Sequence, residues 1–327
     1  MKEIYFAGGC FWGTEHFFSG VDGVVSAESG YAQGREDFSG RPSYEQVYTD
    51  TTGFAETVRV SYNPERISLQ TLAELFFDII DPLSLNRQGH DVGTRYRTGI
   101  YYTSDEDLPV LRTVYDAVQE SVGARLAVEL EPLRSFYPAE ERHQKYLDKN
   151  PDGYCHLPLK TFKYLRLYQD IRLFLGDETD AVARMAETAA FIYERMKFFW
   201  VGFYIVSGNE LTLGPFQGPP ACLRIGYGRG VCGTAWKEAR TIVVPDVEEF
   251  PGHIACSSLS RSEIVVPVPA GTTDPSATGR WARPEAIAAV LDIDSTSIGT
   301  FDATDALWLE KICGLVLLSG THVAGNQ

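Results

Sequence analysis

Residues 8–18 of the chain read GGCFWGTEHFF and follow directly on a strand-like segment, Glu3–Ala7. The glycine pair predicts a tight turn, and the aromatic-rich stretch after it predicts a helix. Cys10 would then lie where a strand turns into a helix, and the unpaired N–H groups and positive dipole end at such a place favour a thiolate. Phe11 and Trp12 would form an apolar wall beside the sulfur, suited to an uncharged, methyl-sized group. A buried structural cysteine fits these residues equally well, so other motifs are needed to tell a reactive cysteine from a structural one.

Strands and helices are predicted to alternate up to about residue 130. Thr57–Tyr62 has the alternation of a strand, and Ser68 is placed to cap a helix that carries an apolar stripe. Tyr96–Thr103 predicts another strand, Asp105 the cap of a second helix, and Ala124–Leu130 a further strand. This alternation predicts a two-layer α/β arrangement of the ferredoxin-like kind.

The length of the chain predicts two domains, because 327 residues is about twice the usual domain size of roughly 150. A polar helix stopped by Pro151 and a glycine-containing tail that carries Cys155 end the first domain. A hinge is expected near Leu157–Thr161. The two domains would therefore span residues 1–158 and 159–327.

The second domain is predicted to be a sheet with flanking helices, so that the whole chain belongs to the α+β class. Helices are expected at Asp177–Lys197, with Val182, Met185, Ala189, Ile192 and Met196 on its packing face, and at Asp302–Leu318. Strands are expected at Val201–Val206, Glu210–Leu213, Thr241–Val244, Ile264–Val268 and Ala288–Ile293. Gly226–Gly233 is typical of a glycine-rich turn, and the residues from Gly271 to Pro284 are typical of a surface loop.

Composition and charge exclude several classes of protein. With 44% hydrophobic and 22% charged residues, the chain has the composition of a globular protein. The net charge of −15 disfavours binding to nucleic acid or to an anionic membrane. The apolar runs are too short for a membrane span, and no apolar stretch of a signal peptide follows the N-terminus. We therefore expect a cytoplasmic protein with no membrane partner.

The six cysteines are too few for a disulfide framework, and in the cytoplasm they would be kept reduced. Their spacings match neither a zinc site nor a C-x-x-C redox motif, so we expect no metal and no cofactor. Cys313 lies in the terminal apolar segment and is expected to pack in the core. Any disulfides that form should be transient.

The string around Cys10 resembles the signature of the A-type peptide methionine sulfoxide reductases, and further motifs extend the resemblance over about residues 1–158. These motifs are SGYAQG at Ser29–Gly34, SYEQVY at Ser43–Tyr48, GFAETVRVSYNP at Gly53–Pro64, RQGHDVGTRYRTGIYY at Arg87–Tyr102 and the ending AEERHQKYL…NPDGYC. The resemblance implies that Cys10 is the nucleophile, that Phe11 and Trp12 form the methyl pocket, and that Cys155 is the resolving cysteine. It also implies that Glu56 is the acid, with Tyr31, Asp91 and Tyr96 as polar supporting groups. Arg142 departs from the family, which more often has an aromatic residue there.

The chemistry explains why these residue types are needed. A thiolate that attacks a sulfoxide sulfur needs a proton donor near the oxygen, which leaves only as hydroxide or water. Glu56 would need a raised pKa for this task, and an apolar pocket supplies one by desolvation. Without the motif, Glu56 would be taken for a solvated strand residue. The attack leaves a sulfenic acid on Cys10, which a second thiol must convert to a disulfide before it is oxidised further.

The second half brings Cys222, Cys232 and Cys256 within 35 positions of one another. Three carboxylates, Glu263, Asp292 and Asp294, interrupt otherwise apolar strands. Charges that point from strands into a cavity usually serve a ligand, and three carboxylates suggest recognition of a cationic amine.

Residues 160–327 resemble the free methionine-(R)-sulfoxide reductases, which have the GAF fold. The resemblance implies that Cys256 is the nucleophile, Cys222 its resolving partner in a disulfide, and Cys232 an auxiliary thiol. Trp200 and Tyr204 would line the methyl pocket, while Glu263, Asp292 and Asp294 would hold the substrate's amino group and assist protonation of its oxygen. The chain departs from the family at Ser257, where an acidic residue is usual, and in the length of the loop from Gly271 to Pro284.

We therefore expect a bifunctional enzyme. The first domain would reduce the S epimer of methionine sulfoxide, free and in oxidised proteins, and the second would reduce the R epimer of the free amino acid. Thioredoxin or a similar dithiol reductant would recharge both sites. Two alternatives stay open: a GAF sensor that binds a small ligand and regulates the first domain, and a general peroxide-reducing thiol protein, which gives no reason for the Phe11–Trp12 pocket or for Glu56.

Overall fold

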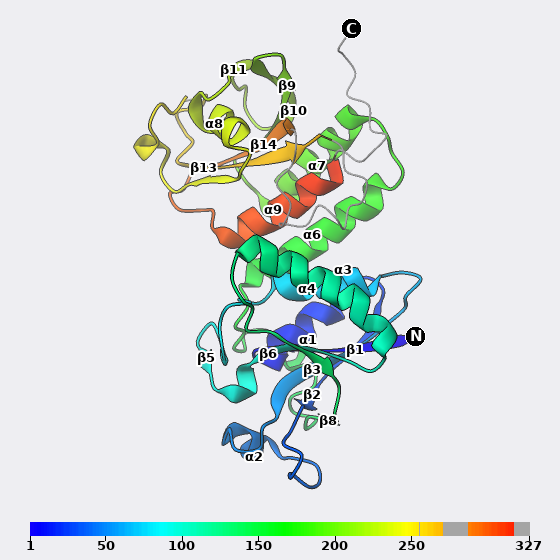
Figure 1. The fold of residues 1–327 in the computed structure, drawn as a ribbon. Coiled ribbons are helices and arrows are strands. Elements are labelled where there is room, and N and C mark those ends of the chain that lie inside the picture. The colour runs from blue at the N-terminus through cyan, green and yellow to red at the C-terminus, as the bar shows by residue number, and fades with distance from the viewer. Residues whose placement is uncertain (255, 271–286, 317–327) are drawn as a thin grey trace. The chain divides into compact units, whose positions relative to one another are not determined.

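The computed structural model describes residues 1–254, 256–270 and 287–316 (Figure 1). Contacts divide the chain into two compact units, Met1–Phe162 and Lys163–Gln327. The division falls inside helix α6 (Leu159–Leu175). The predicted domain limits after residue 158 stay a prediction, as does the loop from Gly271 to Pro284, which lies outside the described residues.

The first unit is built on one sheet with the strand order β7-β6-β1-β3-β2-β8. Its elements are β1 (Lys2–Gly8), α1 (Phe11–Ser19), β2 (Val24–Ala32), α2 (Tyr44–Tyr48), β3 (Ala55–Tyr62), α3 (Leu69–Asp78), β4 (Arg87–Gln88), β5 (Asp91–Val92), β6 (Thr98–Tyr102), α4 (Leu108–Val122), β7 (Glu129–Pro132), β8 (Phe136–Pro138) and α5 (Tyr146–Lys149). Only the β6–β7 pair is parallel among the strand pairs of the described residues. Strands β4 and β5 form a separate hairpin.

Aromatic side chains fix α1 and α3 on the central strand β1. The ring of Phe6 stacks on Phe18 of α1 at a centroid distance of 4.7 Å and on Phe76 of α3 at 4.9 Å. All three side chains are fully buried, and burying such rings contributes most of the local packing energy. Helix α1 therefore begins at a fixed place at the end of β1, and Cys10 is held there.

Several local predictions for the first unit need correction. The side chain of Ser104, and not Asp105, accepts the capping bond, because Asp105–Asp107 forms a separate 3₁₀ turn before α4. Strand β7 begins at Glu129 and not at Ala124. Part of the segment expected to be a hinge, Leu157–Thr161, is helical, since α6 begins at Leu159. Pro158 precedes that helix directly, and a proline at this place starts a helix more readily than it interrupts one.

The second unit contains another sheet, with the order β11-β10-β9-β14-β13-β12 and only antiparallel pairs among the described strands. Its other elements are α7 (Ala181–Met196), β9 (Trp200–Ser207), β10 (Glu210–Gln217), β11 (Arg224–Gly226), α8 (Gly230–Glu238), β12 (Ile242–Val244), β13 (Ser262–Pro269), β14 (Ile287–Ser295) and α9 (Ala303–Val316). Helix α7 packs against β9 and β10, and α9 packs against β13. The α+β class is confirmed for both units.

One prediction for this unit is wrong, and another holds only in part. Helix α7 begins at Ala181, after Asp180 as the N-cap, and not at Asp177. Val182, which was expected on the packing face, is exposed, whereas Arg184 is buried. The glycine-rich stretch that was expected to be a turn has one at Tyr227 and Gly228, but α8 begins within the stretch at Gly230. Gly233 is needed there because a Cβ atom would lie 2.4 Å from the carbonyl oxygen of Gly226.

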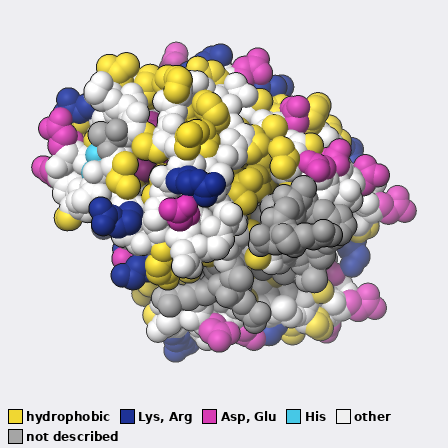
Figure 2. All heavy atoms as spheres, turned by 90° about the horizontal axis from the view of Figure 1, so that it is seen from above, with side chains coloured by type: hydrophobic (Ala, Val, Ile, Leu, Met, Phe, Trp, Pro, Cys, Tyr) yellow, Lys and Arg dark blue, Asp and Glu magenta, His cyan; other side chains and the backbone are white. Residues whose placement is uncertain are grey.

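The described surface carries charges of both signs. On the face drawn in Figure 2, Lys and Arg side chains lie scattered among acidic and apolar ones. Across the described ranges, no helix combines the length and the apolar character that crossing a membrane would require.

Candidate functional site

Cys10 is the N-cap residue of α1, as the sequence predicts. Gly9 makes the preceding turn with a φ of +84°, and a Cβ atom there would lie 2.6 Å from Cβ of Gln88. Only glycine meets both conditions, because other residues are strained at positive φ. The turn leaves the Cys10 side chain 5% exposed at the helix start.

Glu56 of β3 lies beside the same helix start. Its Oε2 atom accepts the backbone N–H of Phe11 at 3.0 Å, and the residue is 2% exposed. Burial raises the pKa of Glu56 to about 8, although the Phe11 N–H acts in the opposite direction. The reading of Glu56 as a solvated strand residue is wrong, because the side chain is buried, and its pKa shift has the direction that a general acid requires.

The ionisation of Cys10 differs from the expectation. Burial, and then the carboxylate of Glu56, raise the pKa of the Cys10 thiol well above its usual value, while a backbone N–H at Trp12 lowers it. In the absence of substrate, the helix start therefore lowers the pKa of Cys10 by less than desolvation raises it. Because each negative charge opposes the other, a proton on Glu56 favours a thiolate on Cys10.

The polar groups expected around Glu56 lie close to it and have partners that the sequence did not indicate. Tyr31 pairs with Glu56 across β2 and β3, and its hydroxyl donates to Glu140 at 2.6 Å. The Glu56 charge raises the pKa of Tyr96, after the larger effect of burial. Asp91 accepts the Tyr154 hydroxyl at 3.0 Å. The motifs that contain Glu140 and Tyr154 were visible in the sequence, but nothing local assigned these residues a contact.

Trp12 forms one wall of an open hollow of about 500 Å³. Its ring stacks on Tyr146 at a centroid distance of 3.7 Å, and its Nε1 donates to Nδ1 of His143 at 3.3 Å. Arg142, the departure from the family, lies at the same hollow, where its guanidinium pairs with Glu45 at 2.9 Å and lies 5.7 Å from the Tyr44 ring centroid. This hollow is wide enough for a side chain and open enough for a polypeptide.

Cys155 lies near α1, far from Cys10 in sequence, and both cysteines are free thiols in this structure. The Cys155 sulfur is 3.1 Å from the position that a Cβ atom on Gly13 would take, so the lack of a side chain at Gly13 makes room for it. Cys155 is half-buried, and burial raises its pKa. His156 follows it, with its pKa lowered to about 4 by burial.

The second unit contains a disulfide between Cys222 and Cys256, with a Cα–Cα distance of 5.4 Å. This is the pair that the family resemblance implies. Cys222 follows β10 and Cys256 precedes β13, so both lie on connections outside the sheet. The Cys222 and Cys256 side chains are only partly buried, whereas Cys232 and Cys313 are buried.

Strand register brings the three carboxylates together on one face of the sheet. Glu263 of β13 pairs with Asp294 of β14, and Asp292 lies two residues before Asp294 on the same face. All three line a cavity of about 20 Å³ that Cys256, Cys232 and His253 also line. A cavity of this size has room for roughly one water molecule, so the disulfide form is closed to an amino acid.

Burial and mutual repulsion change the ionisation of these carboxylates. The pKa values of Glu263 and Asp292 are both raised well above the usual range, by burial first and then by neighbouring carboxylates. The pKa of Asp294 is raised to about 6 by burial. One oxygen of Asp292 is buried without a hydrogen-bond partner among the described residues. Such a site lacks positive charge, and a bound ammonium group would supply it.

The structure places Trp200 and Tyr204 differently from the expected pocket lining. Both are buried on the carboxylate face of β9, but neither lines the cavity of the disulfide form. Trp200 Nε1 donates to the carbonyl of Pro219 at 3.1 Å, and the Tyr204 hydroxyl donates to the carbonyl of Cys222 at 3.1 Å. They hold the segment that carries Cys222. Ser257 accepts the Leu259 N–H at 3.2 Å and does not line the cavity.

The first unit has a buried cysteine beside a carboxyl group that keeps its proton near neutrality. The second unit has two cysteines joined in a disulfide. These features define a thiol-dependent oxidoreductase. A sequence model of the family described as peptide methionine sulfoxide reductase matches residues 2–171. The chain belongs to the peptide methionine sulfoxide reductase family.

Comparison with known proteins gives similar chains for both halves. The peptide methionine sulfoxide reductase MsrA of Clostridium acetobutylicum is 50% identical over 163 residues, which cover 50% of this chain and 99% of that protein. A solved structure of free methionine-R-sulfoxide reductase from Neisseria meningitidis, in complex with its substrate, is 46% identical over 49% of this chain and 89% of its own, with a TM-score of 0.43. A putative GAF sensor protein from Burkholderia vietnamiensis is 40% identical over 49% of this chain and 94% of its own, with a TM-score of 0.43.

Proposed function

We propose that the chain is a bifunctional methionine sulfoxide reductase. The first unit reduces the S epimer, peptide-bound and free, and the second reduces the R epimer of the free amino acid. The observation that carries the proposal concerns the carboxyl group of Glu56. It accepts the Phe11 N–H next to Cys10, and because its pKa is raised to about 8 it keeps its proton at neutral pH. Membership of the family and the carboxylate-lined cavity beside Cys256 support it.

At the first site, the sulfur of Cys10 attacks the sulfoxide sulfur, and Glu56 gives its proton to the oxygen. The oxygen ends on Cys10 as a sulfenic acid, and the substrate leaves as a thioether. The thiol of Cys155 then displaces this oxygen as water and forms a disulfide with Cys10. The open hollow that Trp12 lines is where a methionine sulfoxide that is part of a polypeptide would approach the first site, although Cys10 itself does not line it.

At the second site, Cys256 does the same chemistry and Cys222 displaces the oxygen, which gives the disulfide seen in the structure. The three carboxylates bind the substrate's ammonium group, and one that retains its proton can donate it to the sulfoxide oxygen. Recognition through a free ammonium group selects the free amino acid, because a peptide bond removes that charge. Cys232 lies 3.9 Å from Glu263 and acts as an auxiliary thiol.

Each turnover consumes two thiols, so a dithiol donor has to reduce the protein again. Thioredoxin or a similar dithiol protein is the expected partner, and neither site needs a cofactor for this chemistry. The functional limits of residues 1–158 and 159–327 and the cytoplasmic location also stay predictions.

The test supplies the purified full chain with dithiothreitol and with each epimer of methionine sulfoxide, free and N-acetylated. We expect loss of three substrates, namely both free epimers and the N-acetylated S epimer, measured by chromatography that separates the epimers. The N-acetylated R epimer should be left, because it has no ammonium group. Consumption of the S epimers alone would contradict the proposal and favour a ligand-binding GAF sensor.

The pH should affect substrate binding at the second site in one direction. As the pH falls through about 6, Asp294 gains a proton and loses the charge that pairs with the ammonium group. The KM for the free R epimer should therefore rise below pH 6, by at most about ten-fold per pH unit. Asp294→Asn should give a high KM that no longer changes in this range. The S epimer, measured in the same samples, is the internal control, and a flat KM in the unsubstituted chain would count against the role of Asp294.

A further inference from the structure

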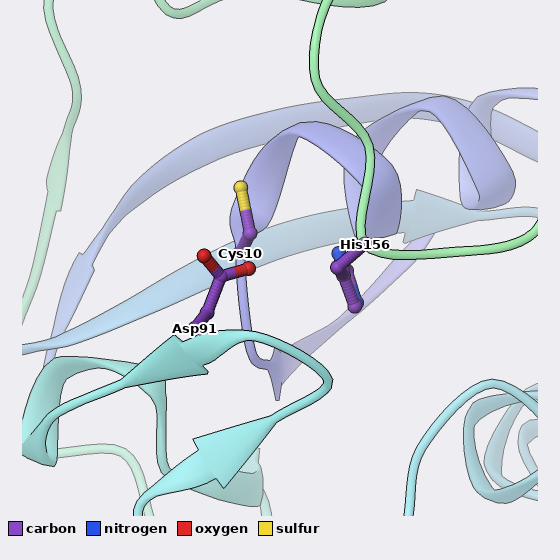
Figure 3. Close-up of side chains that lie close together, drawn as sticks. All are labelled: Cys10, Asp91 and His156. Atoms are coloured by element: carbon purple, nitrogen blue, oxygen red, sulfur yellow. The ribbon is translucent and has the colours of Figure 1, made fainter.

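Three side chains from separate segments meet at the start of α1. Figure 3 shows Cys10 at the helix start, Asp91 on the hairpin of β4 and β5, and His156 on the chain that follows α5. A sulfur, a carboxylate oxygen and a ring nitrogen from these residues all lie within 4.8 Å of one another. The reduction chemistry uses Cys10 and places Asp91 as a polar neighbour, but it gives no task to His156.

The imidazole of His156 has an unusual environment. Both of its ring nitrogens are buried and have no hydrogen-bond partner within the described ranges. The backbone of Gly8 is near enough to act on the ring, but no hydrogen bond of ordinary geometry forms. The ring packs closely on α1, because a Cβ atom on Gly13 would lie 2.9 Å from its Nδ1. Buried polar groups without a partner are costly, so such a ring nitrogen within 4.8 Å of a thiol sulfur and a carboxylate oxygen points to a ligand.

The carboxylate of Asp91 is held in place by a neighbouring side chain. Its Oδ2 atom accepts the Tyr154 hydroxyl at 3.0 Å, which orients the carboxylate. Metal-binding carboxylates commonly have such an outer hydrogen bond, and it is part of what fixes the ligand geometry. Tyr154 and His156 belong to one short segment, so that segment supplies both a ligand and the outer contact of another.

We propose that Cys10, Asp91 and His156 bind one Zn²⁺ ion in the reduced protein. Sulfur, nitrogen and oxygen are the donors that zinc takes in proteins, and three protein ligands leave a fourth position for water. The charges of a thiolate and a carboxylate balance that of the ion. Zinc bonds of about 2.0–2.3 Å require donors roughly 3.5 Å apart, so the three groups close by about 1 Å on binding. A bound ion occupies the sulfur that attacks the substrate, so zinc inhibits the first site reversibly.

The test measures binding without turnover, so its outcome is independent of the proposed reductase activities. The reduced full chain is dialysed against Zn²⁺, and its metal content and affinity are determined. Co²⁺ is then used in place of Zn²⁺, because a bound thiolate gives a sulfur-to-cobalt charge-transfer band. We expect one tightly bound ion, with the band absent in Cys10→Ser. His156→Gln and Asp91→Asn should each weaken binding by about 10- to 100-fold or more.

His16→Gln is the matched control, because this partly exposed histidine of α1 pairs with Asp148 and lies outside the cluster. It should bind zinc as the unsubstituted chain does. Unchanged affinity in both His156→Gln and Asp91→Asn would overturn the proposal. A second group of potential ligands, Cys232, Glu263 and Asp292, also lies within 4.8 Å. Loss of the ion in Cys232→Ser, with retention in Cys10→Ser, would assign the zinc to that group and equally overturn the proposal.

Discussion

Cys10→Ser is expected to abolish reduction of the S epimer and to leave reduction of the free R epimer within about two-fold of the unsubstituted rate. A serine hydroxyl stays protonated at the helix start and cannot form the sulfenic acid, so the first site loses its reaction entirely. Cys256→Ser should have the reverse effect, since the two sites belong to separate compact units. The measurement is the rate of loss of each epimer with dithiothreitol as the donor.

Cys313→Ser provides the control for these two variants. Cys313 is a buried cysteine of α9 that lines neither site, so both activities should persist in any fraction that folds. Mass spectrometry after one turnover adds an independent readout, with the expected bonds Cys10–Cys155 and Cys222–Cys256. Loss of both activities in Cys10→Ser would contradict two independent sites. If Cys256→Ser still reduced the R epimer, Cys256 would not be the nucleophile of the second unit.

Glu56→Gln is expected to lower kcat for the S epimer by about 10²- to 10⁴-fold, which is the usual contribution of a positioned general acid. The amide keeps the size of the side chain and can still accept the Phe11 N–H, but it has no proton to give to the sulfoxide oxygen. The substrate pocket is otherwise unchanged, so KM should change much less than kcat. Single-turnover measurement of methionine release separates this step from reduction of the disulfide.

The pH profile gives a second readout for Glu56. The reactive state combines a protonated Glu56 with a Cys10 thiolate and so holds one proton between the two groups. The rate of S-epimer reduction should therefore rise to a plateau near pH 8, where Glu56 titrates, and fall only above the raised pKa of the Cys10 thiol. The descending limb should be absent from the residual activity of Glu56→Gln. Glu15→Gln is the matched control, because Glu15 is another buried carboxyl group of this unit, with a pKa raised to about 7 by burial. If Glu15→Gln removed the limb and Glu56→Gln kept it, Glu56 would not be the acid.

Many elements of both units and the position of Cys10 could be predicted from local sequence, but β2, α6 and α8 were not. A glycine at positive φ before the cysteine, and a helix after it, follow from residues that are neighbours in the chain. The errors concerned places where local signals were weak or shared. The start of helix α6 was taken for a hinge, and Val182 was assigned to the packing face of α7 although it is exposed.

The tertiary structure decided which groups surround each sulfur. Glu140, Tyr154 and His156 reach the first site from more than a hundred residues beyond Cys10. On the second sheet, the pairing of β13 with β14 places Glu263 opposite Asp294, and a shift of one residue would turn either side chain to the other face. Periodicity along one strand does not fix this register.

The sequence by itself determined the residue types and the turn that holds Cys10 at a helix start, since backbone geometry at a turn depends on adjacent residues. Only the tertiary structure decided the proton affinities: the pKa of Glu56 is raised to about 8 and the pKa of Cys10 is raised against expectation. The reason is that proton affinity depends on how completely a group is removed from water and on which charges lie nearby. Both of these are set by segments that are distant in the chain and close only after folding.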